Sequence, residues 1–196
     1  MTTSALASPR HVLADLLRRS AATPAVQVAG IVGFAVLAAL GAQARIYLWE
    51  VPITLQTVAV YGAGLVLGGR NGALAMGLYL VAGLVAPVFA GDAYGLGYLT
   101  GSASAGYLLS YPLVAALIGA MTARRRRTFV RSGLAMVVGM AVLFTCGVVW
   151  LHVAAGHATW SESILKGALL FVVWDLAKVW LVAGADAGLR RLAGLA

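Results

Sequence analysis

The stretch LLFVVWDLAKVWLVAGA, Leu169–Ala185, decides the class of protein to which this chain belongs. It is an apolar run long enough to cross a bilayer, yet Asp175 and Lys178 lie in its middle. A charged side chain at the centre of a membrane helix costs roughly 2.5–3.5 kcal/mol on insertion scales, so each charge needs shelter from lipid. Residues three apart lie on one helical face, so the two side chains are predicted to pair and to point into a helix bundle.

The composition of the whole chain is that of an integral membrane protein. Of its 196 residues, 62% are hydrophobic and 10% are charged, whereas the apolar share of a soluble domain is nearer half. The length suits about six spans and leaves no room for a separate soluble domain. The net charge of +8 does not indicate nucleic acid, because the arginines fall between apolar runs. The lone Cys146 lies in an apolar stretch and is expected to be a packing residue.

The apolar runs predict an all-α bundle of six transmembrane helices, at residues 26–42, 53–67, 73–88, 107–123, 133–154 and 164–189. Residues 1–25 are predicted to be a cytoplasmic segment that is retained, since no clear cleavage signal follows it. Residues 26–189 then form the membrane domain, and residues 190–196 form a cytoplasmic tail.

The basic residues predict the orientation of the bundle. Eleven of them fall on one side of the six predicted spans and only two on the other, with Lys178 inside the membrane. By the positive-inside rule, both termini lie in the cytoplasm of a cell-membrane protein. The run RRRR is therefore interpreted as a topology anchor. The eleven are Arg10, Arg18, Arg19, Arg70, Arg124, Arg125, Arg126, Arg127, Arg131, Arg190 and Arg191, and the two are Arg45 and Lys166.

The charged pair has three interpretations. It could fasten helices together, although buried ion pairs often add little net stability over apolar replacements. It could relay protons, although no chain of further acids accompanies it. It could bind a neutral polar group such as a ureido ring, because a carboxylate accepts from N–H groups and an ammonium donates to a carbonyl. Trp174 and Trp180 either cover such a ligand or pack elsewhere.

Two polar stretches face the predicted outer side. Residues 92–106, DAYGLGYLTGSASAG, form either a ligand-approaching loop or a plain connection. VPITLQT, Val51–Thr57, brings Gln and Thr groups to the start of the second span, where they bind a ligand or cap the helix. His152 and His157 are expected to be surface residues without a metal role. The sequence contains no Walker motif, so the chain cannot drive transport by hydrolysing ATP itself.

Four motifs in this order and spacing resemble the BioY family, the biotin-specific S components of energy-coupling-factor transporters. They are VPITLQT, GLVLGGRNGALAMGLYLVAGLVAPVFAG, SAGYLLSYP and WDLAK, and the resemblance covers about Ala35 to Gly184. It implies a six-helix S-component fold, capture of biotin from outside, and association with a transmembrane coupling subunit and two ATPase subunits. It also implies a transport component that is not an enzyme and has no cofactor besides its cargo; self-association is left open.

The resemblance carries ligand-binding roles to six positions: Gln56, Tyr79, Gly106, Tyr107, Asp175 and Lys178. We expect the ureido ring at the charged pair and the ligand carboxylate at backbone donors of the Gly106–Tyr107 segment, with the reverse orientation also open. The small residues that dock S components on the coupling subunit fall on Ala35 and Ala39, which are expected on an outer face.

The chain departs from the family pattern at three places. Many members have Gly-Pro where it has Gly68 and Gly69, which is expected to affect only an inner turn. Trp174 stands where members have Gly, and GSASAGY stands where members tend to have Gly-Pro-Thr-Gly-Gly-Tyr. Two alternative functions remain: an S component for another small vitamin, and a structural or assembly membrane protein in which the pair only fastens helices.

Overall fold

A computed structural model of the chain describes residues 23–48, 50–123 and 127–192. Residues 1–22 of the predicted segment 1–25, the arginines at 124–126 and residues 193–196 of the predicted tail 190–196 lie outside the described residues. The described chain runs α2 (Pro24–Gln43), β1 (Arg45–Tyr47), β2 (Pro52–Thr54), α3 (Gln56–Leu67), α4 (Gly69–Val85), α5 (Leu96–Gly101), α6 (Ala105–Ala123), α7 (Phe129–Ala154), α8 (Trp160–Ile164), η1 (Leu165–Leu169, a π-helix) and α9 (Leu170–Leu192).

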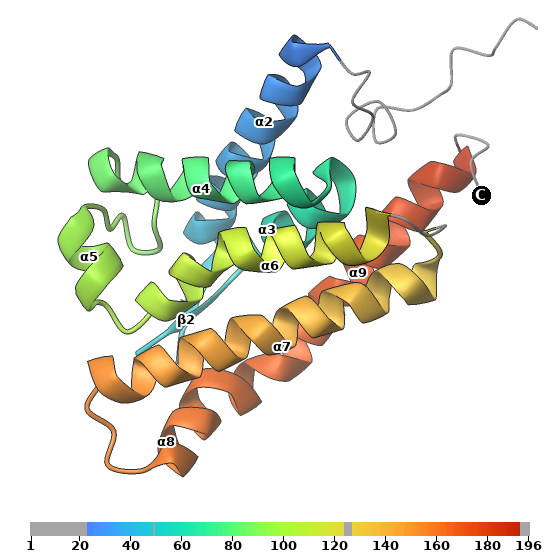
Figure 1. Cartoon of the computed structure of the whole chain (residues 1–196). Helices are drawn as coiled ribbons and strands as arrows, with labels where there is room; N and C mark the ends of the chain where they lie inside the picture. Colours follow the sequence, from blue (N-terminus) through green and yellow to red (C-terminus); the bar gives the residue numbers. More distant parts are fainter. Residues whose placement is uncertain (1–22, 49, 124–126, 193–196) are drawn as a thin grey trace, which may run out of the picture.

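Within the described part, four helical segments are long and apolar enough to cross a membrane. They match the first, fourth, fifth and sixth predicted runs, and their bounds are Pro24–Gln43, Ala105–Ala123, Phe129–Ala154 and Trp160–Leu192. Figure 1 shows β2, α5 and α8 gathered at one end of the bundle, with the C-terminal end of α6, the start of α7 and the end of α9 at the other. The mainly helical membrane fold is thus confirmed, whereas the count of six spans stays a prediction.

The predicted second span, residues 53–67, is wrong at its start. Pro52–Thr54 form strand β2, which pairs antiparallel with β1 through Arg45 opposite Thr54, so α3 has only 12 residues. At 1.5 Å per residue α3 is about 18 Å long, shorter than the roughly 30 Å hydrocarbon core. The hairpin was not predicted, although β-branched Ile53 and Thr54 favour strands and Pro52 suits an edge position.

Glycines let the helices around α3 approach each other closely. A Cβ built on Gly119 of α6 would lie 2.1 Å from the backbone nitrogen of Gly69, and one on Gly64 would lie 2.5 Å from the carbonyl oxygen of Ala115. Such contacts need residues without side chains. Gly68, with φ 82°, turns the chain from α3 into α4. Gly68 and Gly69 thus lie in the expected turn, and Gly69 packs on α6 as well.

Helix α3 is the centre of the bundle and α2 lies at its edge. Helix α3 packs against α2, α4, α6 and α9, and most of its residues are buried. Helix α2 exposes large apolar side chains, which suit a lipid-facing surface. Its Ala35 is only 7% exposed and Ala39 is half-buried against the core. The expected outer placement is therefore wrong for Ala35, because the helix turns that face inward.

Arg127 is buried inside the protein, although the run to which it belongs is interpreted from the sequence as a topology anchor. Its guanidinium donates to the carbonyl oxygen of Leu65 at 2.8 Å and to Asp186 Oδ1 at 3.3 Å. The side chains of Arg127 and Asp186 are only 3% and 6% exposed. This buried ion pair joins the start of α7 to the end of α3 and to α9, far from the other charged pair in α9.

Candidate functional site

A cavity opens between strand β2 and helices α3, α6, α7 and α9, and the chain before and within α5 also lines it. It holds about 570 Å³ of space free of atoms, including the part that is open to solvent. Ligand pockets for small molecules have roughly 300–1,000 Å³ and mostly apolar walls with a few polar groups. The cavity has this character: Leu143, Phe144 and Phe171 form an apolar wall, and Gln56 and the charged pair supply polar groups.

Asp175 and Lys178 pair as their spacing predicts. Lys178 Nζ donates to Asp175 Oδ1 at 2.7 Å. The Lys178 side chain is 11% exposed and the Asp175 side chain is 4% exposed. The same ammonium donates to the carbonyl oxygen of Thr54 at 2.7 Å and to Thr57 Oγ1 at 3.1 Å. An ammonium has three protons to donate, so these three acceptors saturate it.

The carboxylate of Asp175 is equally well satisfied. The Thr57 hydroxyl donates to its Oδ1 at 3.0 Å, and the Tyr61 hydroxyl donates to its Oδ2. A buried charge needs such partners, because desolvation without them is costly. Since Thr57 and Tyr61 belong to α3, the pair fastens α9 to the central helix. Both members also line the cavity, so they can contact a ligand from this position.

Gln56 lines the cavity, whereas Tyr79 holds it in place. The amide nitrogen of Gln56 donates to the Tyr79 hydroxyl at 2.6 Å, and its amide oxygen accepts from Thr54 Oγ1 at 2.8 Å. The Tyr79 hydroxyl in turn donates to the carbonyl oxygen of Val88 at 3.3 Å. Tyr79 is not among the cavity-lining residues, so in this structure it acts on the site through Gln56.

Of the expected backbone donors, Tyr107 reaches the cavity and Gly106 does not. The Tyr107 N–H donates to the carbonyl oxygen of Ser104 at 3.1 Å, and its hydroxyl donates to that of Gly167 at 2.6 Å. A Cβ on Gly106 would lie 2.2 Å from Trp150 Cβ, so Gly106 packs against α7. The Tyr107 ring and the oxygen of its hydroxyl thus remain for a ligand, and its N–H is already bonded.

The structure adds cavity residues that the sequence analysis did not single out. The main one is Tyr111, whose ring stacks on Tyr79 with centroids 6.4 Å apart. The spacing of Tyr107 and Tyr111, four residues apart on α6, was the available signal, because such residues share a helical face. Phe144 and Phe171 carry no comparable pattern, whereas Thr54 belongs to the VPITLQT motif, whose Gln and Thr groups were expected to bind a ligand or cap the helix.

Neither tryptophan beside the charged pair covers the cavity. Trp174 is 57% exposed on the outside of α9. Trp180 packs on Phe129, with ring centroids 5.1 Å apart. The loop at residues 92–106 contains the short helix α5 and contributes Tyr98 and Ser104 to the cavity wall. The departure at Trp174 therefore points away from the cavity, whereas the loop borders it.

Residues 14–194 match the sequence profile of the BioY family. The chain belongs to the BioY family. A BioY-family relative, the probable biotin transporter BioY of Pyrococcus horikoshii, is 31% identical over 155 residues, which cover 79% of this chain and 90% of the relative. The biotin transporter BioY of Thermotoga maritima is 33% identical over 160 residues, covering 81% and 92% of the two chains.

The fold of this BioY-family chain is also similar to a solved structure, the S-component for biotin from an ECF-type ABC transporter. The TM-score is 0.74 with 22% sequence identity, and the match covers 86% of this chain and 94% of the other. This likeness establishes the S-component fold. Family membership and the apolar helices together make the chain a membrane protein of a transport family, not an enzyme.

Proposed function

We propose that this chain is the biotin-binding S component of an ECF-type transporter, which captures biotin in the cavity and has no cofactor apart from this cargo. The observation that carries the proposal is a polar group of Asp175, Lys178 and Gln56 in an otherwise apolar cavity. A BioY-family chain with such a cavity can receive a small ligand that has a hydrocarbon skeleton and one compact polar head. Biotin, the cargo named for its relatives, has both.

The contacts of the charged pair restrict how the head can bind. Asp175 already accepts three hydrogen bonds, and a carboxylate has about four acceptor positions, so one N–H of a ureido ring can be added. Lys178 is saturated, so a ligand oxygen must replace one of its acceptors. The longer bond, to Thr57 Oγ1, is the one that we expect to be replaced. The carboxylate of biotin then lies toward Tyr107 and Tyr111.

Isothermal titration calorimetry of the detergent-purified protein with biotin tests the proposed function. Two analogues separate the two ends of the ligand: lipoate has a similar acid tail but lacks the ureido ring, and biotin methyl ester lacks the charge of the carboxylate. We expect biotin to bind, lipoate not to bind, and the ester to bind more weakly. Binding of another vitamin in place of biotin would contradict the proposed cargo and leave the S-component role.

We also propose that the chain docks through α2 on a coupling subunit that carries two ATPase subunits, as the family resemblance implies. Ala35 is buried, so the small residues available for close helix approach are those on the exposed side of α2. Ala25, Ala29 and Gly33 are exposed and lie four residues apart, and a Cβ on Gly33 would meet nothing within 4 Å. Small residues at this spacing let a partner helix come close.

Ala29→Trp and Gly33→Trp are therefore expected to abolish docking while leaving biotin affinity unchanged. A large indole on this face would hold the partner helix away. Leu37→Trp is the matched control, because Leu37 is 45% exposed on the same helix and already bulky. Co-purification with a coexpressed coupling subunit and ATPases measures docking. If Ala29→Trp and Gly33→Trp both form normal complexes, this face of α2 is not the docking site.

The proposed orientation places both termini in the cytoplasm. The C-terminal end of α6, the start of α7 and the end of α9 lie at the end of the bundle opposite to α5 and α8 (Figure 1). This arrangement agrees with the distribution of basic residues along the sequence. Asp92→Cys is expected to react with an impermeant maleimide from outside, and Arg70→Cys or Arg125→Cys only from the cytoplasm, in a Cys146→Ala background. Labelling from the opposite sides would show that the bundle has the inverse orientation and that the cavity lies toward the cytoplasm.

A further inference from the structure

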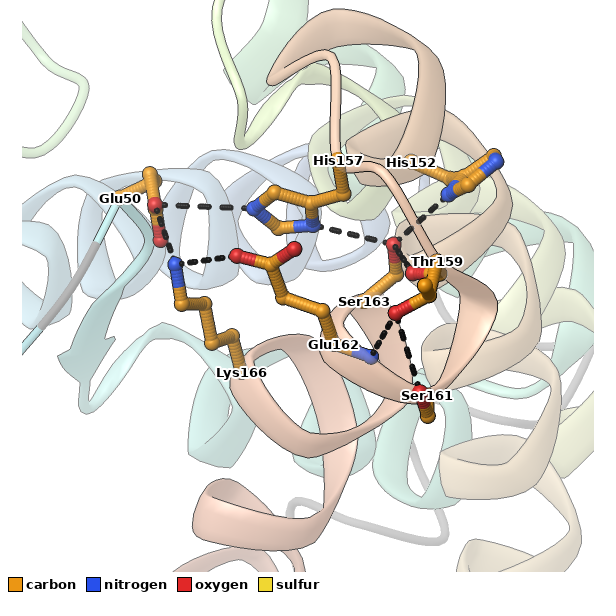
Figure 2. Close-up of polar contacts among 8 residues, drawn as sticks. All are labelled: Glu50, His152, His157, Thr159, Ser161, Glu162, Ser163 and Lys166. Carbon is orange, nitrogen blue, oxygen red and sulfur yellow. Dashed lines mark hydrogen bonds and ion pairs between the residues drawn. The ribbon is translucent and has the colours of Figure 1, made fainter.

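A cluster of polar side chains lies at the predicted outer end of the bundle (Figure 2). It joins the loop between β1 and β2 to a later stretch of the chain that comprises the end of α7, the α7–α8 loop, α8 and η1. Its members are Glu50, His152, His157, Thr159, Ser161, Glu162, Ser163 and Lys166. None of them lines the cavity, so the proposed ligand contacts do not account for the cluster.

Lys166 is the bridge between two of these segments. Its Nζ lies 3.1 Å from Glu50 Oε1 and 2.9 Å from Glu162 Oε1. Glu162 is four residues earlier on the same helical segment, so that pair is local. Glu50 comes from the hairpin loop, so the pair with Lys166 ties the hairpin to the segment that leads into α9. The two pairs involve the same ammonium but differ in what they connect.

His157 adds a second contact to Glu50 and is not the surface residue that the sequence predicts. Its side chain is 5% exposed, and its Nε2 lies 3.6 Å from Glu50 Oε1. Its Nδ1 lies 3.0 Å from Ser163 Oγ, and Nδ1 of His152 lies 2.9 Å from the same oxygen. Figure 2 shows Ser163 between the two imidazoles and Glu50 on the far side of His157.

The Ser163 hydroxyl links these contacts. It has one proton to donate, and the carbonyl oxygen of Thr159, 3.4 Å away, is an acceptor for it beside the two imidazole nitrogens. Whichever partner receives that proton, Ser163 holds the His157 ring with its Nε2 turned toward the carboxylate of Glu50.

The hairpin that Glu50 anchors also forms part of the cavity. Val51, Pro52, Ile53 and Thr54 follow Glu50 directly and line the cavity wall. The carbonyl oxygen of Thr54 accepts the 2.7 Å hydrogen bond from Lys178. At the other end of this segment, the Leu55 N–H donates to the carbonyl oxygen of Gly41 at 3.0 Å. The bridge at Glu50 thus holds one end of a wall segment that touches the charged pair.

We infer that Glu50 is a positioning residue, whose bridge to Lys166 and His157 holds strand β2 against the ligand cavity and slows ligand release. The inference rests on the proposed binding of biotin. In this proposal the outer cluster prolongs the lifetime of the bound state, and its residues do not contact the ligand. Residues of α8 and η1 thereby influence the cavity through the hairpin.

The charge of Glu50 supports the bridge. The charged and titratable groups that face Glu50 are Lys166 and His157, with Glu162 and His152 behind them. A hydrogen bond from its own backbone N–H, and then the side chains of Lys166 and His157, hold the pKa of the Glu50 carboxyl below its usual value, against partial desolvation. Glu50 is therefore an anion opposite the ammonium of Lys166 at neutral pH.

The first test compares Glu50→Gln with the matched control Glu162→Gln. Each variant removes one carboxylate partner of Lys166, but only the first cuts the connection to the hairpin. We expect Glu50→Gln to release radiolabelled biotin about two- to fivefold faster, the range for partly exposed ion pairs, and Glu162→Gln to release it at the parent rate. Equal rates for Glu50→Gln and the parent, or equal acceleration in both variants, would overturn the inference.

The melting temperature separates positioning from a general loss of stability. Without ligand, the melting temperature of Glu50→Gln should equal that of the parent, so that faster release of biotin reports a local change at the hairpin. A melting temperature of Glu50→Gln well below that of both the parent and Glu162→Gln would assign Glu50 a general structural role instead.

A second measurement does not depend on biotin. Val51 is 7% exposed, so Val51→Cys in a Cys146→Ala background should react slowly with a polar maleimide. Adding Glu50→Gln should accelerate this labelling at least twofold, and adding Glu162→Gln should not. Failure of the parent to bind biotin would refute the proposed function alone, whereas unchanged labelling in Glu50→Gln would refute the positioning role itself.

Discussion

Asp175→Asn is expected to weaken biotin binding by tenfold or more. The substitution keeps the shape of the side chain but removes the charge that balances Lys178, and it replaces one acceptor oxygen by a donor. A hydrogen bond to a charged group contributes roughly 1.5–3 kcal/mol, which corresponds to about ten- to a hundredfold in affinity. Lys178→Met should have a similar effect, because Asp175 then stays buried without its counter-charge.

Calorimetry on the purified variants measures this effect, and Asp92→Asn is the control. Asp92 is also an acid on the predicted outer half, but its side chain is 72% exposed and lies outside the cavity. We expect the control to bind biotin like the parent. If Asp175→Asn folds normally and keeps the parent affinity, the pair does not contact the ligand.

The alternative in which the pair only fastens α9 to α3 makes a different prediction. A double variant, Asp175→Leu with Lys178→Met, replaces the buried pair by apolar side chains of similar size. Such replacements are often neutral or stabilising. A purely structural protein would then keep its fold and its function, whereas a biotin-binding S component would keep its fold and lose its ligand.

Asp186→Asn is expected to destabilise the protein by about 3–5 kcal/mol, the typical cost of removing one partner of a buried ion pair. Arg127 would keep its hydrogen bond to the carbonyl oxygen of Leu65 but lose its carboxylate partner, with both side chains shielded from solvent. For a chain of this size the loss corresponds to a decrease in Tm of roughly 6–20 °C. Thermal unfolding in detergent, followed by tryptophan fluorescence, measures it.

The exposed pair of Arg45 and Asp92 provides a matched comparison. The nitrogen–oxygen distance is 3.3 Å in both pairs, but the Arg45 and Asp92 side chains are 27% and 72% exposed. Exposed pairs contribute about 0–1 kcal/mol, so Asp92→Asn should change Tm little. Equal losses in Asp92→Asn and Asp186→Asn would contradict the burial of Arg127. Biotin affinity should be unchanged in folded Asp186→Asn, because this pair lies far from the cavity.

Much of the architecture could be predicted because it depends on local composition. Apolar length alone located the four segments that are long enough to span a membrane, and the three-residue spacing of Asp175 and Lys178 predicted their contact. The predicted helix at Ile53 was wrong because strand pairing with β1 outweighs the hydropathy of that short run. The small residues of α2 were recognisable, but hydropathy could not tell which side of an apolar helix faces the protein.

By itself, the sequence determined that the chain is a helical membrane protein of the BioY type, with a charged pair on one face of its last span. Hydrophobic length, helical periodicity and motif order are one-dimensional properties, so they can be read without coordinates. Only the tertiary structure decided that Tyr79 supports Gln56, that Gly106 packs behind the cavity wall, and that Glu50 meets Lys166. These contacts join residues 23 to 116 positions apart, or bury a residue against another helix, and only packing determines them.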